Sequence, residues 1–317
     1  VPARPDGLRR DLVVAGVPTG GNYDVQVRLL DDASPPAVVA QQVLRDVAVG
    51  DVWVAAGQSN TSGYSGSYSG AETPIPEAHL FGNDGRWKPA SEPMDDGADQ
   101  TDVISAESPT IGFQLAYAKA LFQATGVPVA VVPTSLGGTN LYAQWARNAA
   151  HPASRITLYG SMIHRARVAC PVTPPRGLVW FQGESDALAV RTLAQYEADL
   201  AAFVANARGD LGAPELVFLC GQLGTYSAGN VATWLPIQEA QRRVVAADTH
   251  AALATAVDLG RPDGIHFDVA GYGALGRRFA LGARRVVFGH AVDPTDDLLS
   301  ATAGAGGTSV VLEFEAP

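Results

Sequence analysis

The most informative stretch of the chain reads Asp51-Val-Trp-Val-Ala-Ala-Gly-Gln-Ser-Asn60. Its apolar run shows no alternation with polar residues, which is typical of a strand buried on both faces of a sheet. Ser59 follows directly where this strand runs out into a turn, and a side chain placed there can meet a substrate. Most turn serines only bond the local backbone, so a catalytic Ser59 requires partners from elsewhere in the chain.

The middle of the chain repeats this apolar strand in alternation with helical patterns. Strand patterns lie at 52–56, 127–132, 177–181, 216–220 and 252–257, and helical patterns at 111–125, 158–168, 188–207, 236–248 and 270–288. This alternation predicts an α/β fold with a parallel central sheet covered by helices on both faces. Ligands of such sheets bind outside the carboxyl ends of the strands, which is where Ser59 is expected.

The two ends of the chain have a different pattern from the middle. Residues 1–50 contain short strand patterns, and residues 291–317 contain a glycine-rich turn followed by a strand. We expect a β-rich N-terminal segment (1–50), a catalytic domain (51–290) and a β-rich C-terminal segment (291–317) that packs with 1–50 in one small sheet. Residues 61–108 are rich in Gly, Ser, Pro and Asp and predict a long loop, with its acidic piece 95–99 in solvent.

The composition of the chain limits the classes of function and partner that it can have. The 317 residues are 47% hydrophobic and 17% charged, which is typical of a soluble globular protein with one large core. A formal net charge of −10 argues against nucleic acid or an anionic membrane as a partner. The apolar runs are too short to span a bilayer, and we expect no membrane partner. The oligomeric state cannot be read from the sequence.

Cysteine usage and the first residue bear on the chemistry and the compartment. The sequence contains no CxxC motif or His/Cys cluster, so we expect neither a metal nor a cofactor. Cys170 and Cys220 lie in apolar surroundings, and both free thiols and a single disulfide remain open. The chain begins at Val1 without a leader, from which we expect a processed, secreted or periplasmic protein, with a cytoplasmic one as the alternative.

A candidate base and its orienting acid follow the last strand pattern. His266 stands between that strand and the last helix, which places it at the same sheet edge as Ser59. Asp263 precedes it by three residues, close enough in a tight turn to hold one ring nitrogen. The alternative is a helix-capping aspartate beside an incidental histidine.

Candidate oxyanion donors follow two other strands. Gly137 and Gly138 come after the second apolar strand, and paired glycines let a backbone N–H approach a ligand. Gln182 follows the third strand and carries a neutral amide donor. Together with the N–H of Ser59, these groups predict an oxyanion hole, and four polar motifs at four strand ends favour acyl transfer.

Other patterns in the chain admit different functions. Glu184 and Asp186 form a carboxylate pair that is also compatible with glycoside hydrolysis, and a carbohydrate-binding protein without catalysis is a further alternative. Gly271-x-Gly273-x-x-Gly276 fits a dinucleotide fingerprint by letter, but it does not follow a strand. Aromatic faces pack on sugar rings, so candidate substrate contacts are Tyr64, Tyr68, Trp87, Tyr142 and Trp145.

These motifs, in this order, resemble a known family. The stretches Gly57-Gln-Ser-Asn60, Gly137-Gly-Thr139, Trp180-Phe-Gln-Gly-Glu184 and Asp263-x-x-His266 are similar to those of the sialate O-acetylesterase-like branch of the SGNH hydrolases. That branch includes acetylxylan esterases of carbohydrate esterase family 6. The motifs span about residues 51–290, and together they are specific. The strand-rich ends resemble parts of an accessory β-domain found in larger members.

The resemblance implies a three-layer α/β/α flavodoxin-like fold and a serine esterase that removes O-acetyl groups from carbohydrates. It implies Ser59 as nucleophile, His266 as base, Asp263 as its partner, and Gly137 or Gly138 with Gln182 at the oxyanion. Some relatives use the glutamate of the Gln-Gly-Glu motif as the acid, so Glu184 competes with Asp263 for that role. Thr61 stands where this branch usually has methionine, which changes a pocket wall.

Overall fold

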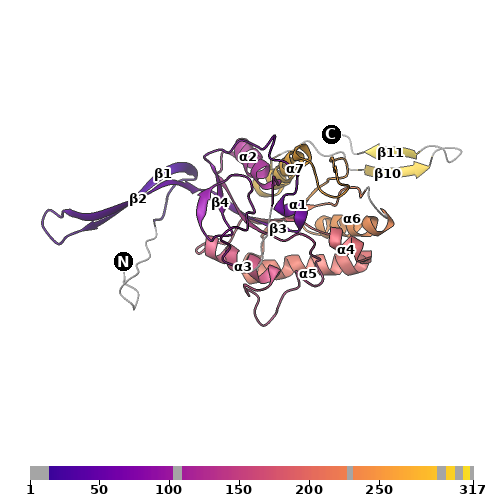
Figure 1. Cartoon of the computed structure of the whole chain (residues 1–317), viewed down its shortest axis with the longest axis horizontal. Helices are drawn as coiled ribbons and strands as arrows, with labels where there is room; N and C mark the ends of the chain where they lie inside the picture. Colours follow the sequence, from indigo (N-terminus) through magenta and orange to yellow (C-terminus); the bar gives the residue numbers. More distant parts are fainter. Residues whose placement is uncertain (1–13, 103–108, 227–230, 291–297, 304–309, 315–317) are drawn as a thin grey trace.

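A seven-stranded sheet forms the centre of the protein (Figure 1). The computed structural model describes residues 14–102, 109–226, 231–290, 298–303 and 310–314. The sheet has the order β5-β4-β6-β3-β7-β8-β9, and all its neighbouring pairs are parallel except β4 with β5. Its strands are β3 (Asp51–Gly57), β4 (Ala78–Phe81), β5 (Trp87–Pro89), β6 (Val129–Ser135), β7 (Gly177–Phe181), β8 (Val217–Gly221) and β9 (Ala251–Ala254).

Helices cover both faces of this sheet. One face carries α2 (Gln114–Thr125) and α7 (Val269–Phe288), which also contact each other. The other face carries α3 (Leu158–Ala169), α5 (Leu193–Leu211) and α6 (Val231–Ala246) (Figure 1). Two short helices, α1 (Ser59–Ser62) and α4 (Glu184–Leu188), begin directly beyond strand ends. The predicted three-layer α/β/α fold is confirmed.

Local signals explain where the long helices begin and end. Thr192 and Gln195 form a reciprocal capping box at the start of α5, and its end is capped by Gly212 in the left-handed conformation. Asp268 accepts a hydrogen bond from the N–H of Gly271 at the start of α7, and Gly289 ends that helix. These caps satisfy N–H and C=O groups that a helix cannot pair internally. The glycine pattern 271–276 therefore lies inside α7 rather than after a strand.

The core fills the space between the sheet and its two helical layers. Buried aromatic side chains mark it on the α3–α5 face, where Trp145, Trp180 and Phe203 contact one another with ring centroids 4.4–6.2 Å apart. Such pairs bury large apolar areas and add a further stabilisation of about 1 kcal/mol each. Cys170 and Cys220 are both free thiols, which settles the question that the sequence left open.

The segment predicted as one long loop contains two short strands of the sheet. β4 and β5 lie between residues 61 and 108, where the sequence predicted no strand. They escaped detection because four and three residues are too few to establish a period. Residues 103–108 lie outside the described part of the chain.

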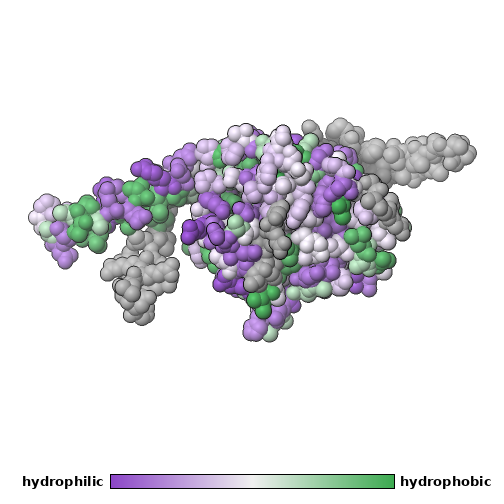
Figure 2. All heavy atoms as spheres, in the orientation of Figure 1, coloured by the Kyte–Doolittle hydropathy of each residue, from purple (hydrophilic) through white to green (hydrophobic). Residues whose placement is uncertain are grey.

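The two ends of the chain form separate hairpins. β1 (Gly20–Leu30) pairs with β2 (Val38–Val49), and β10 (Leu298–Ala303) pairs with β11 (Val310–Phe314). The described strands of the two ends share no sheet, so the expected common sheet is wrong. They project from opposite ends of the core, each pairing with its neighbour in sequence (Figure 1). Exposed apolar side chains such as Val27, Leu29 and Val39 lie along β1–β2 (Figure 2). We propose that the catalytic domain is bounded by residues 51 and 290.

Candidate active site

The turn after β3 is fixed against the neighbouring strand β7. Gly57 has a φ of +149°, and a Cβ there would lie 2.0 Å from the carbonyl oxygen of Phe181, so no other residue fits. The hydroxyl of Thr61 donates to the same carbonyl at 2.8 Å. Ser59 begins α1 between these two contacts and is 7% exposed. The backbone therefore holds Ser59 in one place at the carboxyl edge of the sheet.

A hydrogen-bonded chain links Ser59 to the two residues expected beside it. His266 Nε2 lies 2.8 Å from Ser59 Oγ, and His266 Nδ1 lies 2.7 Å from Asp263 Oδ2. The other carboxylate oxygen, Asp263 Oδ1, accepts the backbone N–H groups of Ile265 at 2.9 Å and His266 at 2.7 Å. The predicted nucleophile, base and acid come together from loops more than 200 residues apart in sequence.

The electrostatics of Asp263 suit an orienting carboxylate. Its partial burial acts to raise the pKa, but the hydrogen bonds from Ile265 and from the backbone and ring of His266 outweigh it and hold the pKa of Asp263 below its ordinary value. Its side chain is 53% exposed, so solvent also favours the charged form. Asp263 is therefore ionised and fixes the imidazole with Nε2 facing the serine.

Glu184 does not contact the histidine. Its Oε1 accepts a hydrogen bond from Asn60 Nδ2 at 2.7 Å, and its side chain is buried at the start of α4. Burial raises the pKa of Glu184. The structure therefore answers the question left open by the sequence, because Asp263 and not Glu184 holds His266.

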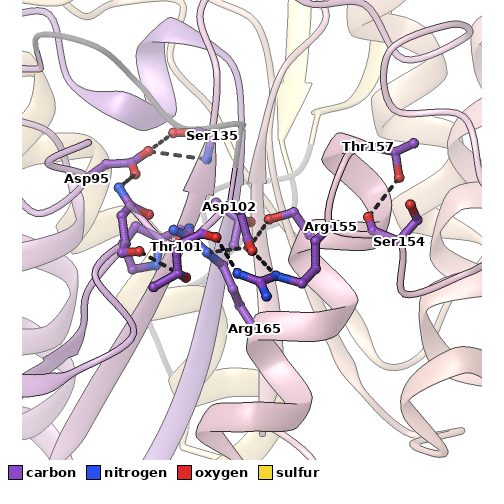
Figure 3. A network of polar contacts seen from close by, with 12 residues as sticks. Asp95, Thr101, Asp102, Ser135, Ser154, Arg155, Thr157 and Arg165 are labelled. Atoms are coloured by element: carbon purple, nitrogen blue, oxygen red, sulfur yellow. Dashed lines mark hydrogen bonds and ion pairs between the residues drawn. The ribbon is translucent and has the colours of Figure 1, made fainter. Parts of the chain in front are cut away.

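A buried network anchors the segment after α1, which sequence reasoning missed (Figure 3). Asp95 accepts hydrogen bonds from Asn83 Nδ2 and from the N–H and hydroxyl of Ser135. The Ser135 hydroxyl also lies 2.8 Å from that of Ser62, in the nucleophile turn. Asp95 is fully buried, whereas the sequence predicted it in solvent. Its bonds to Ser135 join the segment around Asp95 to the end of β6.

A second part of this network fastens the same segment to α3. Asp102 is buried and lies 3.2 Å from Arg165 Nε and 2.6 Å from Arg155 Nε, and it accepts the Ser161 hydroxyl (Figure 3). Burial acts to raise the pKa of Asp102, but the hydrogen bond from Ser161 and the two arginines lower it overall. Sequence offered no signal for this pairing beyond the presence of an aspartate in a polar segment.

Three of the predicted oxyanion donors are backbone N–H groups, those of Ser59, Gly137 and Gly138. A Cβ on Gly137 would lie 3.4 Å from the Cβ of Ser59, so this glycine packs directly against the nucleophile. Gly138 adopts a φ of +72° with open space beside it. Among the described residues, neither N–H has a hydrogen-bond acceptor. Ser59 is the first residue of α1, so its N–H has no acceptor within the helix.

Gln182 does not supply the side-chain donor that the sequence predicted. It is fully buried, and its Nε2 lies 2.6 Å from Asp186 Oδ2 and 3.0 Å from the carbonyl of Thr139. The Gln182 amide has two N–H groups, and these two acceptors use both of them, so none is left for an oxyanion. That prediction is corrected: Gln182 bridges the glycine turn to α4, because the strand end carrying it is covered by the loops around it.

The candidate sugar contacts divide into two groups. Tyr64 stacks on the imidazole of His266 at 5.3 Å between centroids and thus lines the site. Trp145 is only 1% exposed and packs in the core, which corrects its predicted role. Trp87 is 48% exposed but lines a cavity beside the start of β3, at the opposite sheet edge from Ser59, which corrects its role too.

Two aromatic residues remain exposed candidates. Tyr142 lies under the guanidinium of Arg191 at 4.6 Å. Tyr68 donates its hydroxyl to the carbonyl of Pro109 at 3.0 Å, on the segment that follows the nucleophile turn. No contact within the described part of the chain joins either of them to Ser59, and their contact with substrate stays a prediction.

Within the described ranges, no group of three or more His, Cys, Asp or Glu side chains is arranged to hold a metal ion. The helices of the same residues include none that is long and apolar enough to cross a membrane.

A serine, histidine and aspartate in series at the carboxyl edge of a three-layer α/β/α sheet define a serine hydrolase. The sequence pattern of one family of this class, described as carbohydrate esterase, sialic acid-specific acetylesterase, matches residues 49–284. The chain belongs to this family and is a carboxylic ester hydrolase of the carbohydrate O-acetylesterase type. Among curated proteins, no sequence matches it.

Solved structures agree with this assignment. A carbohydrate acetylesterase of Xanthomonas citri is 26% identical with a TM-score of 0.64, and the match covers 88% of this chain and 66% of that one. A protein of Arabidopsis thaliana is 22% identical with a TM-score of 0.61, covering 73% and 97% of the two chains. NanS is 18% identical with a TM-score of 0.54, covering 74% and 97%. The last two similarities show the fold alone.

Proposed function

We propose that Ser59 is the nucleophile of an esterase that removes O-acetyl groups from carbohydrates through an acetyl-serine intermediate. The observation that carries this proposal is the chain from Ser59 Oγ through His266 to Asp263, with contacts of 2.8 and 2.7 Å. Each contact lies within the range that proton transfer requires. Family membership supports acetylated carbohydrate as the substrate class.

The reaction follows from this geometry in two halves. Ser59 Oγ attacks the acetyl carbonyl carbon while its proton passes to His266 Nε2. The tetrahedral intermediate collapses, the C–O bond to the sugar breaks, and His266 returns the proton to the departing sugar oxygen. Water then attacks the acetyl-serine with His266 as base, which releases acetate and restores Ser59. Asp263 stays ionised throughout and stabilises the imidazolium.

The negative charge that develops on the carbonyl oxygen needs donors. The N–H groups of Ser59 and of Gly137 or Gly138 are the candidates, because both glycines lie in the turn after β6 and Gly137 packs on Ser59. A donor of this kind contributes roughly 3 kcal/mol to transition-state stabilisation. With Gln182 engaged elsewhere, we assign the oxyanion to backbone groups.

The geometry weighs against glycoside hydrolysis. That reaction needs two carboxyl groups flanking the scissile bond. Glu184 is hydrogen-bonded to Asn60, and Asp186 accepts the N–H of Leu141 at 2.8 Å and the amide of Gln182. Both side chains are buried and pack against the protein rather than face an open cleft.

The test is Ser59→Ala assayed with a chromogenic acetyl ester and with acetylated xylan, acetylated sialic acid and acetylated chitooligosaccharide. We expect kcat/KM to fall by at least about a thousandfold on every substrate that the wild type hydrolyses. Acetate and reducing sugar are both measured, and the relative rates on the three carbohydrates rank the natural substrate. Retained turnover in the variant, or release of sugar without acetate, would contradict the proposal.

A further inference from the structure

Glu184 has a defined part in this site although it does not touch the histidine. We propose that Glu184 is a positioning residue that acts as an uncharged hydrogen-bond acceptor: through Asn60 it fixes the loop carrying His266 against the turn carrying Ser59. The inference rests on the proposed function, because it assigns a role within the same serine–histidine machinery.

The first step is the saturation of Asn60. Its Nδ2 donates to Glu184 Oε1 at 2.7 Å and to the carbonyl of Ile265 at 3.1 Å. Its Oδ1 accepts the hydroxyl of Tyr272 at 2.8 Å and the N–H of Phe267 at 3.4 Å. Two donors and two acceptor contacts are the whole capacity of one carboxamide.

The second step is what these contacts join. Asn60 follows Ser59 in sequence, whereas Ile265 and Phe267 stand on either side of His266. One buried side chain therefore connects the nucleophile turn to the backbone on both sides of the base. The distance between Ser59 Oγ and His266 Nε2 depends on this connection, and misplacement of a reacting group by about 1 Å costs up to a hundredfold in rate.

The third step is the direction of the amide, which Glu184 fixes together with the backbone groups of Ile265 and Phe267. An amide turned by 180° would place Asn60 Oδ1 against the carbonyl of Ile265 and against Glu184 Oε1, where acceptor would face acceptor. It would also leave the N–H of Phe267 without its acceptor. With its proton on Oε2, the neutral carboxyl of Glu184 presents Oε1 as an acceptor and supports the one orientation in which all four bonds form.

The fourth step is the charge of Glu184. The side chain is 2% exposed, its Oε2 has no hydrogen-bond partner among the described residues, and the same residues provide it with no ion pair. Burial raises the pKa of Glu184 and the nearby Asp186 adds to this, while Asn60, its own backbone N–H and His266 act in the opposite direction without reversing it. Arg261 lines the small cavity next to Glu184, but its guanidinium donates to the carbonyls of Ala256 and Val257. A buried carboxyl without a countercharge keeps its proton.

The experiment compares two substitutions of Glu184. Glu184→Gln keeps an acceptor oxygen and removes the ionisable group, and we expect it to retain at least about a third of wild-type kcat with an unchanged pH profile of kcat/KM. Glu184→Ala removes the acceptor, and we expect kcat to fall roughly ten- to a hundredfold while KM changes by less than about threefold. Glu197→Gln, on α5, is the matched control for loss of a glutamate, and calorimetry monitors folding of each variant.

Specific outcomes would overturn the inference. A Glu184→Gln variant that loses a hundredfold or more would make the charge essential. A shift of its acidic limb to lower pH would show that wild-type Glu184 is ionised, because removing a negative charge near His266 favours the neutral ring. A wild-type kcat in Glu184→Ala would exclude a positioning role for Glu184. If that variant does not fold, the activity and the pH profile of Glu184→Gln still test the inference. The activity of Ser59→Ala tests the proposed function separately, so a failure of that proposal can be told apart from a failure of the inference on Glu184.

Discussion

The two edges of the same sheet differ in what they hold. At the carboxyl edge, Ser59, His266 and Asp263 form an unbroken hydrogen-bonded series. At the amino edge lies a cavity of about 580 Å³, lined by Trp87, by His79 and by residues at the starts of β3 and β6. His79 Nε2 lies 3.0 Å from the backbone carbonyl of Asp46 and pairs with no nucleophile in the described residues. Volume alone therefore does not locate the chemistry.

The difference follows from the architecture. Each parallel strand delivers its loop to the carboxyl edge, so residues distant in sequence converge there. The amino edge receives the returning ends of helices and the base of the β1–β2 hairpin, whose residues pair with their own neighbours. A chain of interacting groups, each oriented by the next, distinguishes the functional edge.

Among the substitutions that test the difference between the two edges, Asp263→Asn is expected to have the largest effect. An amide in this position presents an N–H or an oxygen without charge, so it no longer selects the productive tautomer of His266 or stabilises the imidazolium. We expect kcat to fall by about 10³- to 10⁴-fold, measured with a chromogenic acetyl ester. Asp258→Asn, an exposed aspartate paired with Arg278, is the control. More than a tenth of wild-type activity in Asp263→Asn would mean that another group orients the histidine.

A smaller effect is expected from Glu92→Gln, on the segment between the two edges. Glu92 accepts N–H bonds from Met94 and Gly112, and burial raises its pKa from 4.5 to about 8. The stability contributed by its proton is complete below about pH 4.5 and is lost as pH rises through about 8, since the unfolded chain ionises first.

Glu92→Gln removes that loss. We expect the variant to melt about 2–4 °C above wild type at pH 8, with the difference shrinking toward pH 5, while kcat is little changed. Differential scanning calorimetry across this pH range measures it. Equal melting temperatures at pH 8 would show that Glu92 ionises without cost in the folded protein.

The smallest effect is expected from Trp87→Ala at the amino edge. Trp87 packs edge-on against Phe81 at 5.2 Å and lies beyond the opposite end of β3 from Ser59. We expect kcat and KM for a small acetyl ester within about twofold of wild type. A large rise in KM for that ester would indicate that the two edges are not independent.

The sequence predicted the three-layer core and the edge of the sheet that carries Ser59 and His266, because both depend on local signals. Apolar strands identify the sheet, and polar motifs at strand ends identify its active edge, so Ser59 and His266 could be placed there, while the choice between Asp263 and Glu184 as the acid needed the structure. The direction of a side chain at a strand end is different, because it depends on which loop covers it. Gln182, which follows β7, is fully buried for that reason, and the same holds for Asp95 and Trp145 in the loops themselves, where no periodic pattern predicts burial.

The buried anchors of Figure 3 have a consequence for how substrate is captured. Asp95 and Asp102 fasten residues 95–102 to β6 and α3 through buried side chains. Because these anchors lie in the core, we expect the segment that they hold to be in position before an acetylated sugar arrives. We therefore expect substrate binding to need no rearrangement of this segment, in contrast to enzymes whose loops must close over the substrate.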